Sequence, residues 1–136
     1  MHLLLLSCSK VKRKDEGPCR AMDLYDGPSF RILRKMEREG RMPKGLDIMI
    51  VSGKYGIIGS NDEVEYYDRI IDEDAIASTN SRQKLQGILS RGYDGVFVNM
   101  GKNYIWHFDD ILKGNIFANG RIGEKNAQMK RWLLSL

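Results

Sequence analysis

The chain has 136 residues, of which 42% are hydrophobic and 29% are charged, so we predict one folded α/β domain over residues 1–136 and exclude global disorder. The formal net charge of +4 permits an anionic partner without requiring one. No segment approaches the roughly 20 apolar residues of a membrane span, and the short leucine run near the start has neither the length nor the cleavage site of a signal peptide.

Short apolar runs alternate with amphipathic segments along the chain. This alternation predicts an α/β fold in three layers, with a mostly parallel central sheet of about four strands and helices on both faces. The expected elements are a strand at 3–6, a helix at 27–41, a strand at 46–52, a helix at 80–92, a strand at 95–101, a weak strand at 115–120 and a helix at 123–136.

Boundary signals support the first two helices. Pro28 suits a first helical turn and Gly40 a stop, whereas Asn80 is a predicted N-cap with Gln83 three residues later. Residues 59–79 form an acidic insert that we expect to be rich in loops and a candidate for function. The apolar faces of the helices are expected to comprise Phe30, Leu33 and Met36, then Leu85, Ile88 and Leu89, then Met129, Trp132 and Leu133.

The carboxyl ends of the predicted strands are the first place to look for a site, because ligands of open parallel sheets bind there. Each end offers small residues, which let a ligand approach the backbone, and at least one lysine, which attracts phosphate. The repetition predicts a shared anion site, although loops after strands are often rich in these residues for structural reasons. The residues are Ser7, Cys8, Ser9, Lys10 and Lys12; Ser52, Gly53, Lys54, Tyr55 and Gly56; and Gly101, Lys102, Asn103 and Tyr104. Arg13 and Lys14 are interpreted as solvated charge.

Known cofactor and metal patterns are missing from these loops. Neither the Gly-x-Gly-x-x-Gly dinucleotide pattern nor the Gly-x4-Gly-Lys-Ser/Thr phosphate loop occurs, so we predict no tightly bound cofactor. Cys8 and Cys19 are the only cysteines and His2 and His107 the only histidines, without the spacing of a zinc site. We therefore predict no metal, no disulfide framework and a reducing, cytoplasmic location.

Two further segments carry carboxylates beside aromatic residues. Asp23 and Tyr25 precede the first long helix, together with Asp26, which is expected to cap that helix. Tyr67 and Asp68 end the acidic insert. A tyrosine can stack on a base while a carboxylate binds amino protons or steadies an oxocarbenium ion, but Tyr25 can equally pack against the sheet, and the Tyr66–Tyr67 pair can serve as a hydrophobic latch.

Cys8 and His107 each have a chemical and a structural interpretation. The cationic neighbours of Cys8 favour a thiolate, but no histidine lies near it in the sequence. A small, packed residue at the end of a strand is therefore the favoured role for Cys8. His107 follows Trp106 in a helical stretch and is expected to be structural.

Several motifs, taken in order, resemble a known family. The segments are Ser-Cys-Ser-Lys-Val-Lys at 7–12, Ala-Met-Asp-Leu-Tyr at 21–25, Ser-Gly-Lys-Tyr-Gly at 52–56, and Tyr-Asp at 67–68. They are similar to the YaaA peroxide-stress proteins and to a set of short bacterial, archaeal and phage proteins with the same motifs. The relatives usually have proline where this chain has Tyr66.

The resemblance implies an α/β nucleotide-handling core with a link to DNA and oxidative stress. Carried over to this chain, it singles out the lysines of the first motif and the tyrosines and carboxylates of the others as site residues. The residues that it marks are Cys8, Lys10, Lys12, Asp23, Tyr25, Ser52, Lys54, Tyr55, Gly56, Tyr67 and Asp68.

Together these observations predict a protein that binds a nucleobase or nucleotide, most readily within nucleic acid. Lysines would meet phosphate, Tyr55 or Tyr67 would stack on the base, and Asp68 or Asp23 would act in cleavage or exchange of a glycosidic bond. The alternatives are a non-catalytic DNA- or RNA-binding stress protein, a small-molecule phosphate-handling enzyme, and an interaction module. The sequence does not indicate an oligomeric state.

Overall fold

The computed structural model describes residues 1–13 and 17–136. Lys14, which we interpret as solvated charge, lies outside the described residues. Within them no helix has the length and apolar character needed to cross a membrane.

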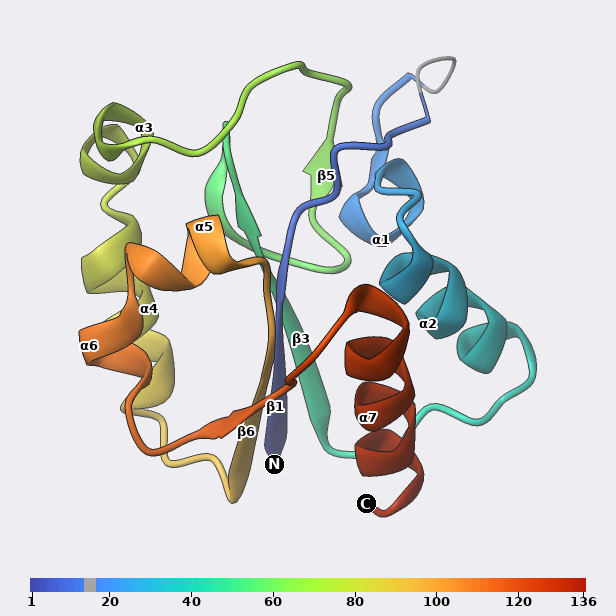
Figure 1. Cartoon of the computed structure of the whole chain (residues 1–136). Helices are drawn as coiled ribbons and strands as arrows, with labels where there is room; N and C mark the ends of the chain where they lie inside the picture. The colour runs from blue at the N-terminus through green and yellow to red at the C-terminus, as the bar shows by residue number, and fades with distance from the viewer. Residues whose placement is uncertain (14–16) are drawn as a thin grey trace.

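A five-stranded sheet forms the centre of the molecule (Figure 1). Its order is β4-β3-β1-β6-β7, and every neighbouring pair is parallel except β4 with β3. The strands are β1 (His2–Ser7), β3 (Leu46–Ser52), β4 (Gly56–Gly59), β6 (Gly95–Asn99) and β7 (Ile116–Phe117).

Side chains alternate between the two faces of the sheet, and helices cover both (Figure 1). Leu4 and Leu6 of β1 pack with helices α2 (Pro28–Arg38) and α7 (Ile122–Leu134). Leu3 and Leu5 belong to the opposite face, with α4 (Ser81–Leu89), the buried Phe108 and α6 (Asp109–Leu112). Because all four leucines are buried, β1 is the centre of two apolar cores.

Short elements surround the carboxyl end of the sheet. A small second sheet pairs β2 with β5, next to helix α1, and helices α3 and α5 lie on the other side (Figure 1). Their bounds are β2 (Cys19–Arg20), α1 (Ala21–Leu24), β5 (Glu63–Val64), α3 (Glu73–Ser78) and α5 (Lys102–Trp106).

The predicted mixed α/β fold and mostly parallel sheet are confirmed, with differences in detail. The sheet has five strands rather than about four, because the Gly56–Gly59 run folds back on β3 as an antiparallel edge. The expected cap at Asn80 is wrong: Asn80 adopts a left-handed conformation (φ 52°), and its side chain makes no capping hydrogen bond. The acidic insert is more ordered than expected, since it contains β5 and α3.

Candidate functional site

The sheet has a topological switch point between β1 and β6. The two strands are parallel neighbours. After β1 the chain passes to α2 on one face, and after β6 it passes to α5 and α6 on the other, so the two connections diverge (Figure 1). In open α/β sheets such divergence leaves a crevice beyond the carboxyl ends of the strands, where ligands bind.

Two hollows lie at this point, one on each side of the loop after β1, and they share Cys8 and Ser9. The first, which we call the α2–α7 hollow, has a volume of about 190 Å³. The second, which we call the lysine hollow, has a volume of about 230 Å³. Besides the shared pair, the lysine hollow is lined by Lys10, Lys12, Asp68, Arg69, Ile70 and Tyr104.

The structure thus brings together several residues that are distant in the sequence but were predicted to share a site. Lys10, Lys12 and Asp68 meet in the lysine hollow, while Ser7 and Gly101 line the α2–α7 hollow. Ser7 also joins the two strand ends, because its Oγ accepts a hydrogen bond from the Gly101 amide at 3.1 Å. The convergence of the first and third strand ends supports the shared-site prediction.

Cys8, which follows β1, lies close to Tyr104 of α5. Its Sγ lies 2.9 Å from the Tyr104 hydroxyl, 96 residues away in the chain. Burial raises the pKa of Tyr104 well above its ordinary value, and the neighbouring Cys8 adds to the rise. Tyr104 therefore keeps its proton at neutral pH and can donate it in a hydrogen bond to sulfur or to a ligand.

Behind the lysine hollow lies a buried cluster of three hydroxyls, from Tyr25, Ser52 and Tyr67. The Tyr67 hydroxyl lies 2.8 Å from each of the other two, and Tyr25 donates to Ser52 at 3.3 Å. Ser52 Oγ also accepts from the amides of Lys54 and Tyr55, at 3.2 and 3.0 Å. Burial is the main cause that raises the pKa of both tyrosines. These hydrogen bonds join Tyr25, which follows α1, to Ser52 at the end of β3 and to Tyr67 in the acidic insert.

At one edge of this cluster, two lysines flank a pair of packed tyrosine rings. Lys54 Nζ lies 5.1 Å from the centroid of the Tyr55 ring, which packs edge-on against Tyr67 at 5.6 Å. Lys12 Nζ lies 4.6 Å from the centroid of Tyr67. Tyr25 is fully buried and Tyr67 is 6% exposed, so Tyr25 packs against the core and neither ring presents an open face to a base. Tyr55 is partly exposed, and its hydroxyl bonds the backbone of Glu65.

Both carboxylates before the first long helix are engaged in ion pairs. Asp23 binds Arg20 at 3.1 Å and lines neither hollow, and that hydrogen bond is the main cause that lowers the pKa of Asp23. Asp26 pairs with Arg31 and Arg34 instead of capping the helix, so the capping prediction is wrong. Asp68 is consequently the better-placed candidate of the two predicted catalytic carboxylates.

Gly53 and Gly56, the glycines that follow β3, have structural roles. A Cβ on Gly53 would lie 2.5 Å from the carbonyl oxygen of Arg69, so this glycine lets the segment that carries Asp68 pass close by. Gly56 has a φ of +76°, and a Cβ there would lie 2.7 Å from the Thr79 side chain. Neither glycine lines a hollow at the switch point.

Gly56→Ala is expected to destabilise the protein by about 2 kcal/mol or more, because alanine is strained in this conformation and overlaps Thr79. Urea denaturation measures the effect. Gly87→Ala is the matched control: it lies inside α4 with open space around it and should stabilise by about 0.5–1 kcal/mol. A Gly56→Ala variant as stable as the wild type would show that the turn is not held against Thr79.

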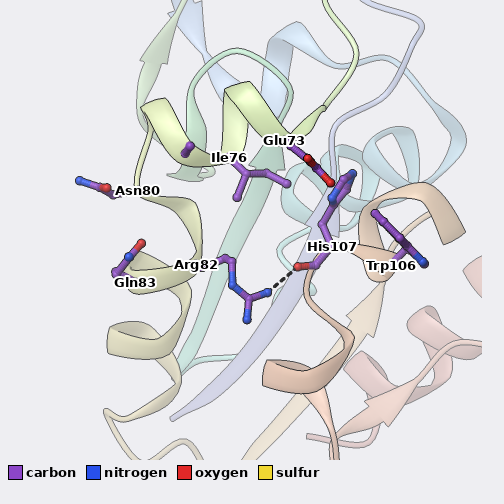
Figure 2. Close-up of a pocket in the computed structure, with 8 residues that line it drawn as sticks. Glu73, Ile76, Asn80, Arg82, Gln83, Trp106 and His107 are labelled. Atoms are coloured by element: carbon purple, nitrogen blue, oxygen red, sulfur yellow. Dashed lines mark hydrogen bonds between the residues drawn. The ribbon is translucent and has the colours of Figure 1, made fainter.

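A larger cavity lies elsewhere, between α3, α4 and α5, with a volume of about 570 Å³ (Figure 2). Arg82 spans it and donates to the carbonyl oxygen of His107 at 2.7 Å, and also binds Asp110. Trp106, which is 67% exposed, lies at its edge beside His107. None of the residues that we predicted for the site lines this cavity, and Arg82 serves to join α4 to α6.

Sequence reasoning missed several residues of the two hollows. Tyr104 was predicted among the residues after the third strand, but its contact with Cys8 was not, since that contact depends on the pairing of β1 with β6. Asn99, Lys125 and Asn126 line the α2–α7 hollow. Asn99 at the end of its strand was the one available signal, because a polar residue there is unusual after a run of apolar ones. In the described part of the chain, no three His, Cys, Asp or Glu side chains gather as a metal site would require.

A comparison with protein families finds one match, described as a family of unknown function (DUF6884), over residues 3–117. The chain belongs to this family. The match runs from β1 to β7, so it covers both strand ends of the switch point and the lysine hollow, but not α7. Searches of curated proteins and of solved structures find no match.

Proposed function

We propose that this protein binds a nucleotide, presented within nucleic acid, at the carboxyl edge of its sheet. One observation carries the proposal: Lys10, Lys12 and Asp68 line one hollow at the switch point, although they come from two distant segments. The lysines supply positive charge for phosphate, and Arg69 adds a third cation to the same wall. Lys12 is held in place, since it pairs with Tyr25 through the backbone and its Nζ lies over Tyr67.

We further propose that the lysine hollow supports cleavage of a glycosidic bond. In this step water attacks C1′ of the sugar, and Asp68 accepts a proton from that water as the C–O bond forms. The base leaves with the electron pair of the C–N bond and takes up the proton. The Asp68 carboxylate is exposed and forms no ion pair within the described residues, so it also offers negative charge to an oxocarbenium-like sugar.

The likeness to YaaA-like proteins, the link to stress and the cytoplasmic location stay predictions from the sequence. A cytoplasmic setting suits the proposal, because Cys8 lines both hollows and a reducing compartment would keep its thiol intact.

Lys12→Ala is expected to weaken binding of a short single-stranded oligonucleotide about tenfold, because a charged partner of the phosphate is lost. Fluorescence anisotropy at two salt concentrations measures it, and the variant should show a shallower salt dependence than the wild type. Lys44→Ala removes an exposed lysine just before the amino end of β3 and should bind like the wild type.

Two results would contradict the proposal. If Lys12→Ala and Lys10→Ala leave the affinity for the oligonucleotide unchanged, its phosphate binds elsewhere on the protein. A wild-type protein that binds phosphorylated sugars but no nucleotide or oligonucleotide would instead indicate a small-molecule phosphate-handling enzyme.

A further inference from the structure

The α2–α7 hollow has a polar floor whose hydrogen-bonding capacity is only half used. Asn99 ends β6, Asn126 lies on α7, and they are only 9% and 7% exposed. Asn99 Nδ2 donates to Asn126 Oδ1 at 3.1 Å and lies 3.3 Å from the sulfur of Met129. Among the described residues, no hydrogen bond is made by Asn99 Oδ1 or Asn126 Nδ2. Since no fully enclosed side-chain polar atom of the described chain lacks a partner, both atoms open onto the hollow.

Because both atoms open onto the hollow, they can bond to water or to a ligand. The bond between the two amides leaves one acceptor, Asn99 Oδ1, and one donor, Asn126 Nδ2, for that purpose. A donor and an acceptor are also what the edge of a nucleobase offers, as in the pairing of an asparagine with adenine.

The walls of the hollow suit a flat apolar ring. Phe30 and Met100 contribute buried apolar side chains, and Ile122 stands at the edge of the hollow with 68% of its surface exposed. The volume of about 190 Å³ is below the roughly 300–1,000 Å³ of pockets for drug-sized ligands and suits a single ring system. Lys125 also lines the hollow, but its Nζ donates to the carbonyl oxygen of Met100 at 3.2 Å. The polar floor and apolar walls therefore favour a base over a phosphate.

We propose that the α2–α7 hollow is the base-binding pocket and that the Asn99–Asn126 pair recognises the edge of the base. The inference rests on the proposed function, because it places the rest of the same nucleotide in the lysine hollow. The two hollows share Cys8 and Ser9, so a nucleotide that crosses the β1 loop reaches both. Asn99 and Asn126 are specificity residues in this arrangement, and Lys10 and Lys12 bind the phosphate.

Asn126→Leu tests the assignment with two probes, a set of nucleoside 5′-monophosphates and ribose 5-phosphate, in isothermal titration calorimetry. The variant should weaken binding of the preferred monophosphate about tenfold and leave ribose 5-phosphate within twofold. Lys12→Ala should weaken both. Gln86→Leu, which changes an exposed amide side chain of α4 outside both hollows, is the matched control.

A second variant distinguishes a loss of base recognition from a folding defect. Asn126→Leu strands the amino group of Asn99, whereas the double variant Asn99→Leu/Asn126→Leu removes both partners and should fold with a melting temperature near that of the wild type. Its expected binding pattern is that of Asn126→Leu.

Each contrary result has its own meaning. Unchanged monophosphate binding, or equal loss of both probes in the folded double variant, overturns the base pocket and leaves the phosphate site standing. A wild-type protein that binds ribose 5-phosphate as tightly as every monophosphate overturns it too. A wild-type protein that binds neither these probes nor the oligonucleotide overturns the proposed function itself, whereas one that binds the oligonucleotide alone overturns only the base pocket.

Discussion

Asp68→Asn is expected to reduce base release about 100- to 10,000-fold while nucleotide affinity stays close to that of the wild type. The asparagine keeps the shape of the side chain but cannot accept the proton of the attacking water. It also removes the negative charge that would steady the sugar. Because Asp68 is exposed and its side chain makes no hydrogen bond within the described residues, the substitution should leave the fold unchanged.

The measurement needs two readouts on the same protein. Chromatography of the free base, after incubation with oligonucleotides that contain each common base, gives turnover, and anisotropy with a labelled oligonucleotide gives affinity. Asp74→Asn is the control, because it neutralises an exposed carboxylate in the first turn of α3 that lines neither hollow. Its turnover should equal that of the wild type.

The same two readouts separate an enzyme from a binding protein. If wild-type protein binds the oligonucleotide, releases no base, and keeps its affinity in Asp68→Asn, the chain is a non-catalytic nucleic-acid-binding protein. The glycosidic step is then wrong, and the phosphate site at Lys10 and Lys12 is retained.

The strands and long helices of this chain could be predicted because their apolar residues follow the burial pattern of a strand or the period of a helix. The run Leu3–Leu6 is apolar on both faces, and Phe30, Leu33 and Met36 repeat at helical spacing; both are buried as expected. The edge strand β4 could not be recognised, because two isoleucines between glycines resemble a turn as much as a strand. Its identity depends on pairing with β3, which is a long-range property.

The residues of the candidate site could likewise be predicted only where they depend on local sequence. Which residues follow the strands is a local matter, so Ser7, Lys10 and Lys12 could be named in advance. Which of them share a hollow depends on strand order. β1 lies beside β6 in the sheet, although β1 ends at Ser7 and β6 begins only at Gly95. Asn126 lies on a helix with a polar exterior, and nothing in its neighbourhood predicts that its amide reaches Asn99.

The same limit explains why the sequence left Tyr25 and Tyr67 open, each either to stack on a base or to pack in the structure. An exposed ring and a buried one look alike in a sequence, and only the meeting of both hydroxyls with Ser52 shows that these tyrosines belong to the interior. Their chemistry is therefore tied to stability, which has a measurable consequence at alkaline pH.

Alkaline unfolding is expected to be steep because of these two tyrosines together with Tyr104, whose pKa burial also raises. In the unfolded chain a tyrosine loses its proton near pH 10, whereas burial raises the pKa of Tyr25 and Tyr67 in the folded protein. Above about pH 10 the folded state thus binds more protons than the unfolded state, so the free energy of unfolding falls as pH rises. Each tyrosine accounts for about 1.4 kcal/mol per pH unit, or about 3 kcal/mol for the pair. The stabilisation is complete below pH 10 and is lost as pH rises towards the pKa of the folded state.

Tyr67→Phe should reduce this slope by about 1.4 kcal/mol per pH unit, since one titrating hydroxyl is gone. It should also cost about 1–3 kcal/mol at neutral pH, because Ser52 and Tyr25 each lose a partner. Urea denaturation between about pH 8 and pH 11 gives both numbers. Ser52→Ala is the matched control: it disturbs the same cluster but removes no group that titrates, so it should lower stability at neutral pH and keep the slope. Equal slopes for Tyr67→Phe and the wild type would mean that the Tyr67 hydroxyl ionises in the folded protein as easily as in the unfolded chain.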